Sequence, residues 1–144
     1  MTRLSLGGNQ LTRVMLPTGL FNLAWLNLQD NQLTDLSFLE GLTSLTSLNL
    51  DGNQLTSLAL PDGLTNLESL DLSDNQLTGL TLPEGLTDLR RLDLSRNQLT
   101  NFSFLEGLSN LASLSITHNQ LSSLTLPEGL NSLTRLYLPG GNPL

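Results

Sequence analysis

The tetrapeptide Asn31-Gln32-Leu33-Thr34 decides the fold, because it recurs along the whole chain at a constant interval of 22 residues. A fixed period of about 20–50 residues is typical of solenoids, in which each repeat packs on its neighbours. The sequence therefore predicts one solenoid domain over residues 1–144. Further copies, the last with serine in place of threonine, begin at Asn9, Asn53, Asn75, Asn97 and Asn119.

Composition agrees with a stack of equivalent layers, since 42 of the 144 residues are leucine. Charged residues make up 13%, against about 25% in an average soluble domain. The net charge of −7 disfavours binding to phosphate backbones, and we expect no nucleic-acid partner. The sequence contains no run of 18 apolar residues, so we expect no membrane span. Met1 already lies in the first repeat, so we expect no signal peptide, and the absence of cysteine leaves the compartment undetermined.

Each repeat contains a short alternating segment, for example Leu26-Asn27-Leu28, that is preceded by Leu23. Alternation with period two predicts a strand whose leucines point inward and whose intervening side chains point outward. The first copy starts at Met1 and the last at Leu133. Equivalent strands in successive turns run in the same direction, which predicts a parallel sheet of about seven strands.

The repeated asparagine predicts a buried ladder, because a side-chain amide can pair with loop backbone groups that are turned away from water. Asn142 lies one residue beyond its expected slot at position 141, so we expect the ladder to end within 139–144. Pro139 and Pro143 follow the last strand and lack N–H donors, which would blunt an open sheet edge.

The segment that returns to the next strand has two forms. The proline return, Leu-Pro-x-Gly-Leu, occupies 16–20, 60–64, 82–86 and 126–130, and the second form, Phe-Leu-Glu-Gly-Leu, occupies 38–42 and 104–108. Both forms place apolar residues three or four apart around a glycine, which is consistent with one short 3₁₀-like turn per repeat.

The whole chain resembles the leucine-rich repeat family, and residues 31–45 are most similar to the 22-residue bacterial subtype of internalin-like proteins. It departs from that subtype in having no N-terminal helical cap and in its proline returns. The resemblance implies an α/β solenoid, a right-handed coil with a parallel concave sheet and short 3₁₀ or extended convex segments. It also implies that the concave sheet binds another protein.

The repeat register identifies the outward residues of the sheet, which vary while the leucines do not. Trp25 is the sharpest candidate, because large exposed aromatic side chains mark contact sites; the alternative is that it packs over Arg3. Tyr137 is similar but could simply cover the end of the sheet. The predicted protein-binding residues are Trp25, Asn27, Asn49, Asp71, Arg91, Asp93, Arg96, His118 and Tyr137.

Charged residues cluster in the middle of the predicted sheet. They form either a self-satisfied surface network or a patch that selects a partner. The members are Glu68, Asp71, Asp74, Arg90, Arg91, Asp93 and Arg96.

The sequence predicts no catalytic, cofactor or metal site. Asp71 and Asp93 would face solvent beside arginines, with nothing to raise one pKa as a glycosidase requires. The same arginines oppose a calcium site built from Asp51 and its aspartate neighbours Asp71, Asp74 and Asp93. His118 is the only histidine, and we interpret it as a rim residue. The threonine column that starts at Thr12 is flanked by leucines, so we expect no flat surface that could bind ice.

The leading functional hypothesis is therefore a non-enzymatic module that recognises a protein partner. The rival hypothesis is a structural segment whose uncapped terminal repeats stack on a second copy or on the rest of a longer array.

Overall fold

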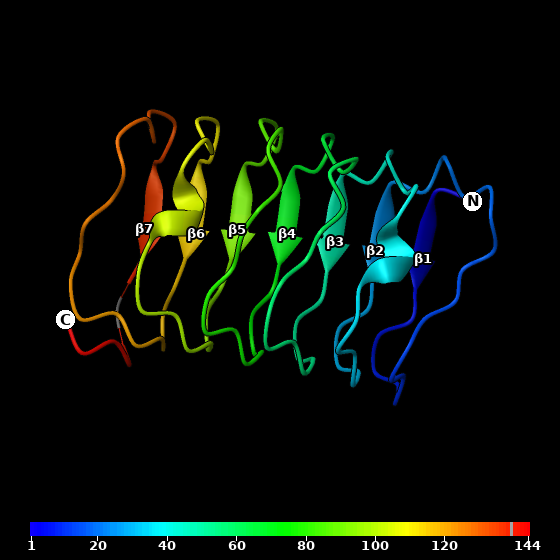
Figure 1. The fold of residues 1–144 in the computed structure, drawn as a ribbon, viewed down its shortest axis with the longest axis horizontal. Helices are drawn as coiled ribbons and strands as arrows, with labels where there is room; N and C mark the ends of the chain where they lie inside the picture. The colour runs from blue at the N-terminus through cyan, green and yellow to red at the C-terminus, as the bar shows by residue number, and fades with distance from the viewer. Residues whose placement is uncertain (139) are drawn as a thin grey trace.

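The computed structural model describes residues 1–138 and 140–144, and it shows a solenoid with one seven-stranded parallel sheet in sequence order (Figure 1). This confirms the predicted fold and number of strands. The chain ends lie at opposite ends of the stack (Figure 1). The strands are β1 (Arg3–Ser5), β2 (Trp25–Asn27), β3 (Ser47–Asn49), β4 (Ser69–Asp71), β5 (Arg91–Asp93), β6 (Ser113–Ser115) and β7 (Arg135–Tyr137).

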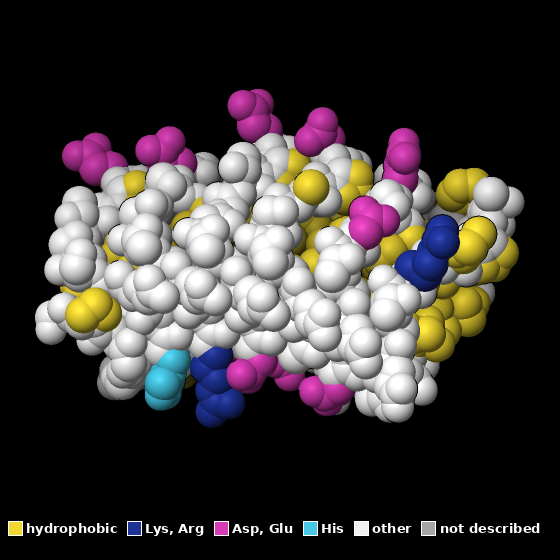
Figure 2. Space-filling model, turned by 60° about the horizontal axis from the view of Figure 1, so that its bottom comes forward, with side chains coloured by type: hydrophobic (Ala, Val, Ile, Leu, Met, Phe, Trp, Pro, Cys, Tyr) yellow, Lys and Arg dark blue, Asp and Glu magenta, His cyan; other side chains and the backbone are white. Residues whose placement is uncertain are grey.

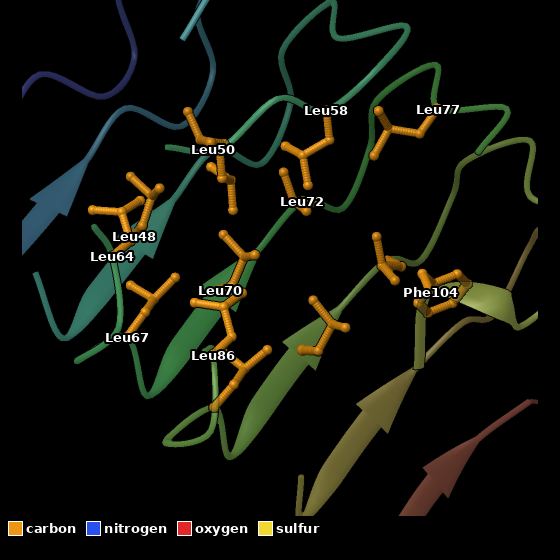
Figure 3. Packing of buried hydrophobic residues seen from close by; sticks show 14 of the residues in the cluster. Leu48, Leu50, Leu58, Leu64, Leu67, Leu70, Leu72, Leu77, Leu86 and Phe104 are labelled. Atoms are coloured by element: carbon orange, nitrogen blue, oxygen red, sulfur yellow. The ribbon is translucent and has the colours of Figure 1, made fainter. Parts of the chain in front are cut away.

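The pairing register follows the 22-residue period, so that Leu26 pairs with Leu48 and Leu48 with Leu70. These central leucines are buried, whereas the residues on either side of them point out of the sheet. Figure 3 shows how leucines of the strands, such as Leu70, pack with leucines of the returns, such as Leu86. One apolar layer per repeat therefore stacks into a continuous core.

Only the second return form makes a 3₁₀ helix in the described residues, at η1 (Ser37–Leu39) and η2 (Ser103–Leu105). Every return contains an i→i+3 backbone hydrogen bond, for example from Leu67 to Leu64, but the described proline returns do not extend this turn into a 3₁₀ helix. In η1, the N–H of Leu39 donates to the carbonyl of Leu36 at 3.0 Å. The equivalent residue of a proline return, such as Pro61, has no N–H to donate, and it disfavours a helical conformation in the residue before it.

The asparagine ladder is confirmed. Asn53 is typical: its Nδ2 donates to the carbonyls of Leu28 and Leu50 at 3.0 Å each, and its Oδ1 accepts the N–H of Leu33 at 3.0 Å. Each amide thus connects its own turn to the preceding one. No buried side-chain nitrogen or oxygen lacks a partner in the part of the chain that is described. The buried rungs are Asn31, Asn53, Asn75, Asn97 and Asn119.

The prediction that Asn142 falls out of the ladder is wrong. Its Oδ1 accepts the N–H of Leu121 at 3.2 Å, and its Nδ2 donates to the carbonyl of Ile116 at 2.9 Å. The additional residue is accommodated by Gly140 and Gly141, whose φ angles are +81° and +76°. Two consecutive left-handed residues tighten the turn enough to return the amide to its slot. Pro139, expected at this edge, lies outside the described residues, and Pro143 is exposed.

Replacing Gly141 with alanine should therefore detach the last rung. Its φ is unfavourable for alanine, and an added Cβ would lie 2.7 Å from the Cα of His118. We expect the amide of Leu121, which donates to Asn142, to lose most of its protection from hydrogen exchange. The amide of Leu99, which donates to Asn119, should keep its protection. Gly79→Ala is the matched control, because a Cβ there meets nothing within 4 Å; equal exchange in both variants would contradict this account.

Candidate binding site on the sheet face

The outward-pointing surface of the strands, called the sheet face here, carries most of its arginines at one end of the strands and most of its aspartates at the other, with Glu68 and Arg96 as exceptions. Four of the six arginines lie at the amino-terminal ends of strands: Arg3, Arg91 and Arg135 open β1, β5 and β7, and Arg90 precedes β5. Aspartates lie at the opposite ends, which is the edge where Figure 2 shows acidic, basic and histidine side chains close together. The aspartates of this edge are Asp30, Asp51, Asp71, Asp74 and Asp93.

Trp25 lies on the sheet face as predicted, but it is half-buried and already has a partner. The guanidinium carbon of Arg3 lies 4.4 Å from the centroid of its ring, which is a cation–π contact. The alternative of packing over Arg3 is therefore the arrangement that the structure shows. The two side chains together form a flat platform across β1 and β2.

Asn27, Asn49, Asp71 and Asp93 are also on the sheet face, and all four are half-buried. Each one uses a side-chain oxygen to accept the backbone N–H two residues later, at 2.9–3.0 Å. This Asx-type turn holds the chain as it leaves the strand. Residue types in this column are therefore partly dictated by the local backbone, a role that strand periodicity alone does not reveal.

Arg96 and His118 occupy a column that sequence reasoning treated only as outward-facing. Every described residue of this column has a positive φ, for example +54° at Arg96 and +53° at His118. The recurrence of glycine and aspartate in the column was the available signal, because both tolerate the left-handed region better than most residues. This backbone geometry directs both side chains to the exposed rim of the face.

The predicted charge network reduces to one ion pair among the residues that the structure describes, between Arg96 Nη1 and Asp74 Oδ2 at 3.3 Å. The two side chains are 63% and 48% exposed, so the pair contributes little to stability. Arg90, Arg91 and Glu68 instead line an open hollow of about 460 Å³ together with Ser47 and Ser69. Its lining carries two guanidinium groups, two hydroxyls and the one carboxylate of Glu68, and this net positive charge favours a carboxylate or another anionic group.

The remaining predicted residues are near the C-terminal end of the sheet. Tyr137 is 48% exposed in β7. His118 donates its backbone N–H to the carbonyl of Gly140 at 2.7 Å, and its ring lies against the Gly140-Gly141 turn. The structure therefore distributes the nine predicted residues along the sheet rather than bringing them into one compact site.

Asp51 is the residue of this face whose pKa is raised. Burial disfavours its charged form, and the nearby carboxylates of Asp71, Asp74 and Asp30 add to the effect, while a hydrogen bond from Ser73 opposes it. A pKa that is higher in the folded state than in the unfolded state means that stability is lost as the pH rises through the folded value.

We therefore expect Asp51→Asn to raise the denaturation midpoint at pH 7, with a gain that shrinks as the pH falls below about 4.

Asp35 provides the opposite case. Hydrogen bonds from the Ser37 hydroxyl, which has the larger effect, and from the Ser37 N–H lower the pKa of Asp35. Asp35→Asn should lower the midpoint at pH 7, again with a smaller effect in acid. Midpoints of thermal unfolding at pH 7 and pH 3.5 would test both, and shifts of the same sign would contradict the assignment.

The described residues also bear on the metal, membrane and threonine-surface alternatives. No group of three or more histidine, aspartate or glutamate residues is arranged to hold a metal ion within the described ranges. None of the helices found there is long and apolar enough to cross a membrane. The threonines of the repeated tetrapeptide are exposed, and buried leucines such as Leu55 and Leu77 separate them from the neighbouring glutamines, so they form a single file.

Comparisons with known proteins agree with this geometry. A family model described as "Leucine Rich repeats (2 copies)" matches residues 22–62 and 65–107. Internalin C2 from Listeria monocytogenes is 41% identical, with a TM-score of 0.87 over 98% of this chain and 62% of that chain. The TLR13–ssRNA13 complex gives 32% identity and a TM-score of 0.81, over 95% of this chain and 22% of the other. The leucine-rich repeat domain of APL1B gives 29% identity and 0.78, over 99% and 41%.

A search among curated protein sequences gave no match. The chain spans less than two thirds of the length of each of these three structures, so their full activities do not transfer directly. The family model covers more than half of the sequence, and the internalin match extends over nearly all of it. The chain belongs to the leucine-rich repeat family and is similar to internalins.

Proposed function

We propose that this chain is a non-enzymatic recognition module that binds another protein on its sheet face. Leucine-rich repeats are commonly protein-interaction modules, and the observation that supports this face is its charge separation. Arginines at one end of the strands and aspartates at the other would orient a partner of complementary polarity. The Trp25–Arg3 platform would provide apolar contact area at the N-terminal end.

The hollow beside Arg90 and Arg91 is the sharpest feature of the proposed site. No described residue forms an ion pair with either guanidinium, although the molecule carries a net charge of −7. We infer that a carboxylate of the partner enters this hollow, since paired guanidinium groups favour such bidentate contacts. The aspartates at the other end of the strands would then contact basic side chains of the same partner.

Arg91→Glu is expected to weaken partner binding by at least about tenfold, because it replaces an attractive charge at the centre of the face with a repulsive one. Arg13→Glu is the matched control, since Arg13 is exposed but lies outside the sheet. Partners captured by the wild-type protein would be compared quantitatively among wild type, both arginine variants and Trp25→Ala. Equal retention by Arg91→Glu and Arg13→Glu, together with full retention by Trp25→Ala, would remove the sheet face as the site.

The RNA in the TLR13 complex raises a contrasting possibility for this chain. We still expect no RNA binding at physiological salt, because the acidic surface repels phosphates and the four arginines at the amino-terminal ends of the strands do not form a continuous stripe. A fluorescence titration with single-stranded RNA at 150 mM salt would check this. Saturable binding there that Arg91→Glu abolishes would replace the protein partner with RNA.

A second candidate function, self-association, rests on the exposed apolar surface of the first repeat. Met1, Met15 and Phe21 are 63%, 82% and 65% exposed, and Figure 2 shows apolar side chains covering this end of the molecule. The N–H of Leu6 donates to the carbonyl of Asn27 in β2. By alternation along the strand, the peptide groups of Arg3 and Ser5 therefore face the open edge. Light scattering of wild type and Ser5→Pro would test it: a dimer lost in Ser5→Pro but kept in Trp25→Ala supports association through this edge.

A further inference from the structure

Two equivalent grooves lie on the return face, the side of the coil formed by the return segments. The first, of about 270 Å³, runs between Leu16–Phe21 and Phe38–Leu42. The second, of about 460 Å³, runs between Leu82–Thr87 and Glu106–Leu108. Residues of the second groove lie 66 positions, or three repeats, after their counterparts in the first.

Both grooves occur where a proline return is followed by a 3₁₀ return. A 3₁₀ segment rises about 2.0 Å per residue and an extended one about 3.3 Å, so the coiled return cannot cover the extended one before it. The exposure of the first leucine of a proline return shows whether the next return covers it. Leu60, which is followed by another proline return, is 8% exposed, whereas Leu82, which is followed by the return containing η2, is only partly buried.

The glycines of the returns differ in how closely the preceding turn approaches them. A Cβ added to Gly63 or Gly85 would meet a threonine methyl of the preceding turn at 3.1 or 3.4 Å. The same addition to Gly41 or Gly107, which belong to the 3₁₀ returns, meets nothing within 4 Å. Gly129, which belongs to the last proline return, also meets nothing, so the missing contact accompanies the two grooves but is not restricted to them.

The grooves combine apolar walls with acidic rims. Leu16, Leu20 and the 65%-exposed Phe21 line the first groove, and Leu82, Pro83 and Leu86 line the second. Carboxylates stand at both rims, and none of them forms an ion pair with a described residue. Figure 2 shows acidic side chains along one long edge of the molecule. The exposed acidic residues of this return column are Glu40, Asp62, Glu84, Glu106 and Glu128.

We propose that the return face binds an extended, basic peptide segment of a partner protein, which inserts one large apolar side chain into each groove. Three strand spacings of about 4.8 Å place the grooves about 14 Å apart. An extended peptide covers that distance in four residues, and an even interval directs both side chains to the same face. Four residues of helix span only about 6 Å, so a helical segment with this spacing does not reach both grooves.

The peptide thus has the form apolar–three residues–apolar, with lysine or arginine among the intervening and flanking positions. Its positive charges would lie beside the carboxylates of Glu40, Glu84 and Glu106. The return face is distinct from the sheet face. The return face would bind positively charged side chains, whereas the hollow beside Arg90 and Arg91 would bind a negatively charged carboxylate. Binding here does not depend on the function proposed above.

The test is a fluorescence anisotropy titration of the intact chain with labelled synthetic peptides. The main probe carries two phenylalanines four residues apart among lysines. Comparison probes place the phenylalanines two residues apart, replace both with serine, or replace the lysines with glutamate. We expect saturable binding of the main probe, a loss of about tenfold for the shorter spacing, and no measurable binding of the other two.

Two variants with matched controls locate the site. Phe21→Ser should weaken binding of the main probe several-fold, whereas Leu124→Ser, which removes a side chain that is 51% exposed and outside both grooves, should not. The double variant Glu84→Gln/Glu106→Gln should weaken binding more than Asp30→Asn/Asp74→Asn, which removes two charges from the sheet face. All four sets of side chains are exposed, so circular dichroism should show unchanged folding.

Three results would overturn the proposal. The first is no saturable binding of the main probe. The second is binding that is indifferent to phenylalanine spacing and falls equally in every charge variant, which would indicate general electrostatic attraction only. The third is binding that Trp25→Ala or Arg91→Glu abolishes while the groove variants retain it, which would place the peptide on the sheet face.

Discussion

Asn75→Ala is expected to lower the free energy of unfolding by about 3–5 kcal/mol, because it leaves several buried backbone groups without partners at once. Asn75 Oδ1 accepts the N–H of Leu55 at 3.0 Å, and its Nδ2 donates to the carbonyls of Leu50 and Leu72 at 3.0 and 3.2 Å. The residue is 8% exposed, so water cannot readily replace these bonds. Equilibrium unfolding in guanidinium chloride, followed by circular dichroism, would measure the loss.

Asn9→Ala is the matched control for this prediction. Asn9 occupies the same position of the motif, but it is exposed and its amide bonds only to the carbonyls of Leu6 and Gly7 in its own turn. We expect a loss below about 1 kcal/mol there. Similar losses in the two variants would show that the ladder does not stabilise the fold through buried backbone groups.

Leu70→Ala should destabilise the protein by about 2–5 kcal/mol, the range for truncating a fully buried leucine. Leu70 is 1% exposed at the centre of β4, in the middle of the stack, where Figure 3 shows it among leucines of the strands and the returns. The layers on both sides are continuous, so the cavity cannot be filled by movement of a single element. Leu124→Ala, at a side chain that is 51% exposed, should change stability by less than about 1 kcal/mol.

The variant Leu70→Ala also tests how cooperatively the coil unfolds. Each repeat contacts mainly its neighbours, so a weakened central layer should let the two halves unfold at different denaturant concentrations. Trp25 is the only tryptophan and reports on β2, whereas circular dichroism reports on the whole chain. We expect the two signals to coincide in the wild-type protein and to separate in Leu70→Ala. Coincident transitions in the variant would indicate that the coil unfolds as one unit despite the cavity.

The sequence predicted well those features that depend on a repeated local pattern. Leu26 and Leu28 alternate with outward residues, and both are buried as the alternation requires. Asn31 and its equivalents recur at one interval, and they form the expected ladder. The outward-facing residues could be located as a set of columns, but whether the nine predicted residues bind a partner remains a prediction, because no pattern within one chain identifies a partner.

The errors arose where a conformation depends on the neighbouring backbone and not on spacing. Counting residues excluded Asn142 from the ladder, since counting assumes that every residue advances the chain equally, and two left-handed glycines break that assumption. A self-satisfied network was one of two interpretations of the mid-sheet charges, but the described residues form a single ion pair, between Arg96 and Asp74. The two return forms are equivalent in the spacing of their apolar residues, although only one of them can donate the hydrogen bond that closes η1.

By itself, then, the sequence determined the parallel coil, its leucine layers, its amide rungs and the columns that face outward, because all of these follow from a 22-residue period and the alternation of side chains. Only the tertiary structure decided that Trp25 packs with Arg3, that the column containing His118 is left-handed, and that two grooves open on the return face. These features depend on how adjacent turns approach one another. That approach is set by backbone conformations and side-chain volumes in two repeats at once, which no single repeat encodes.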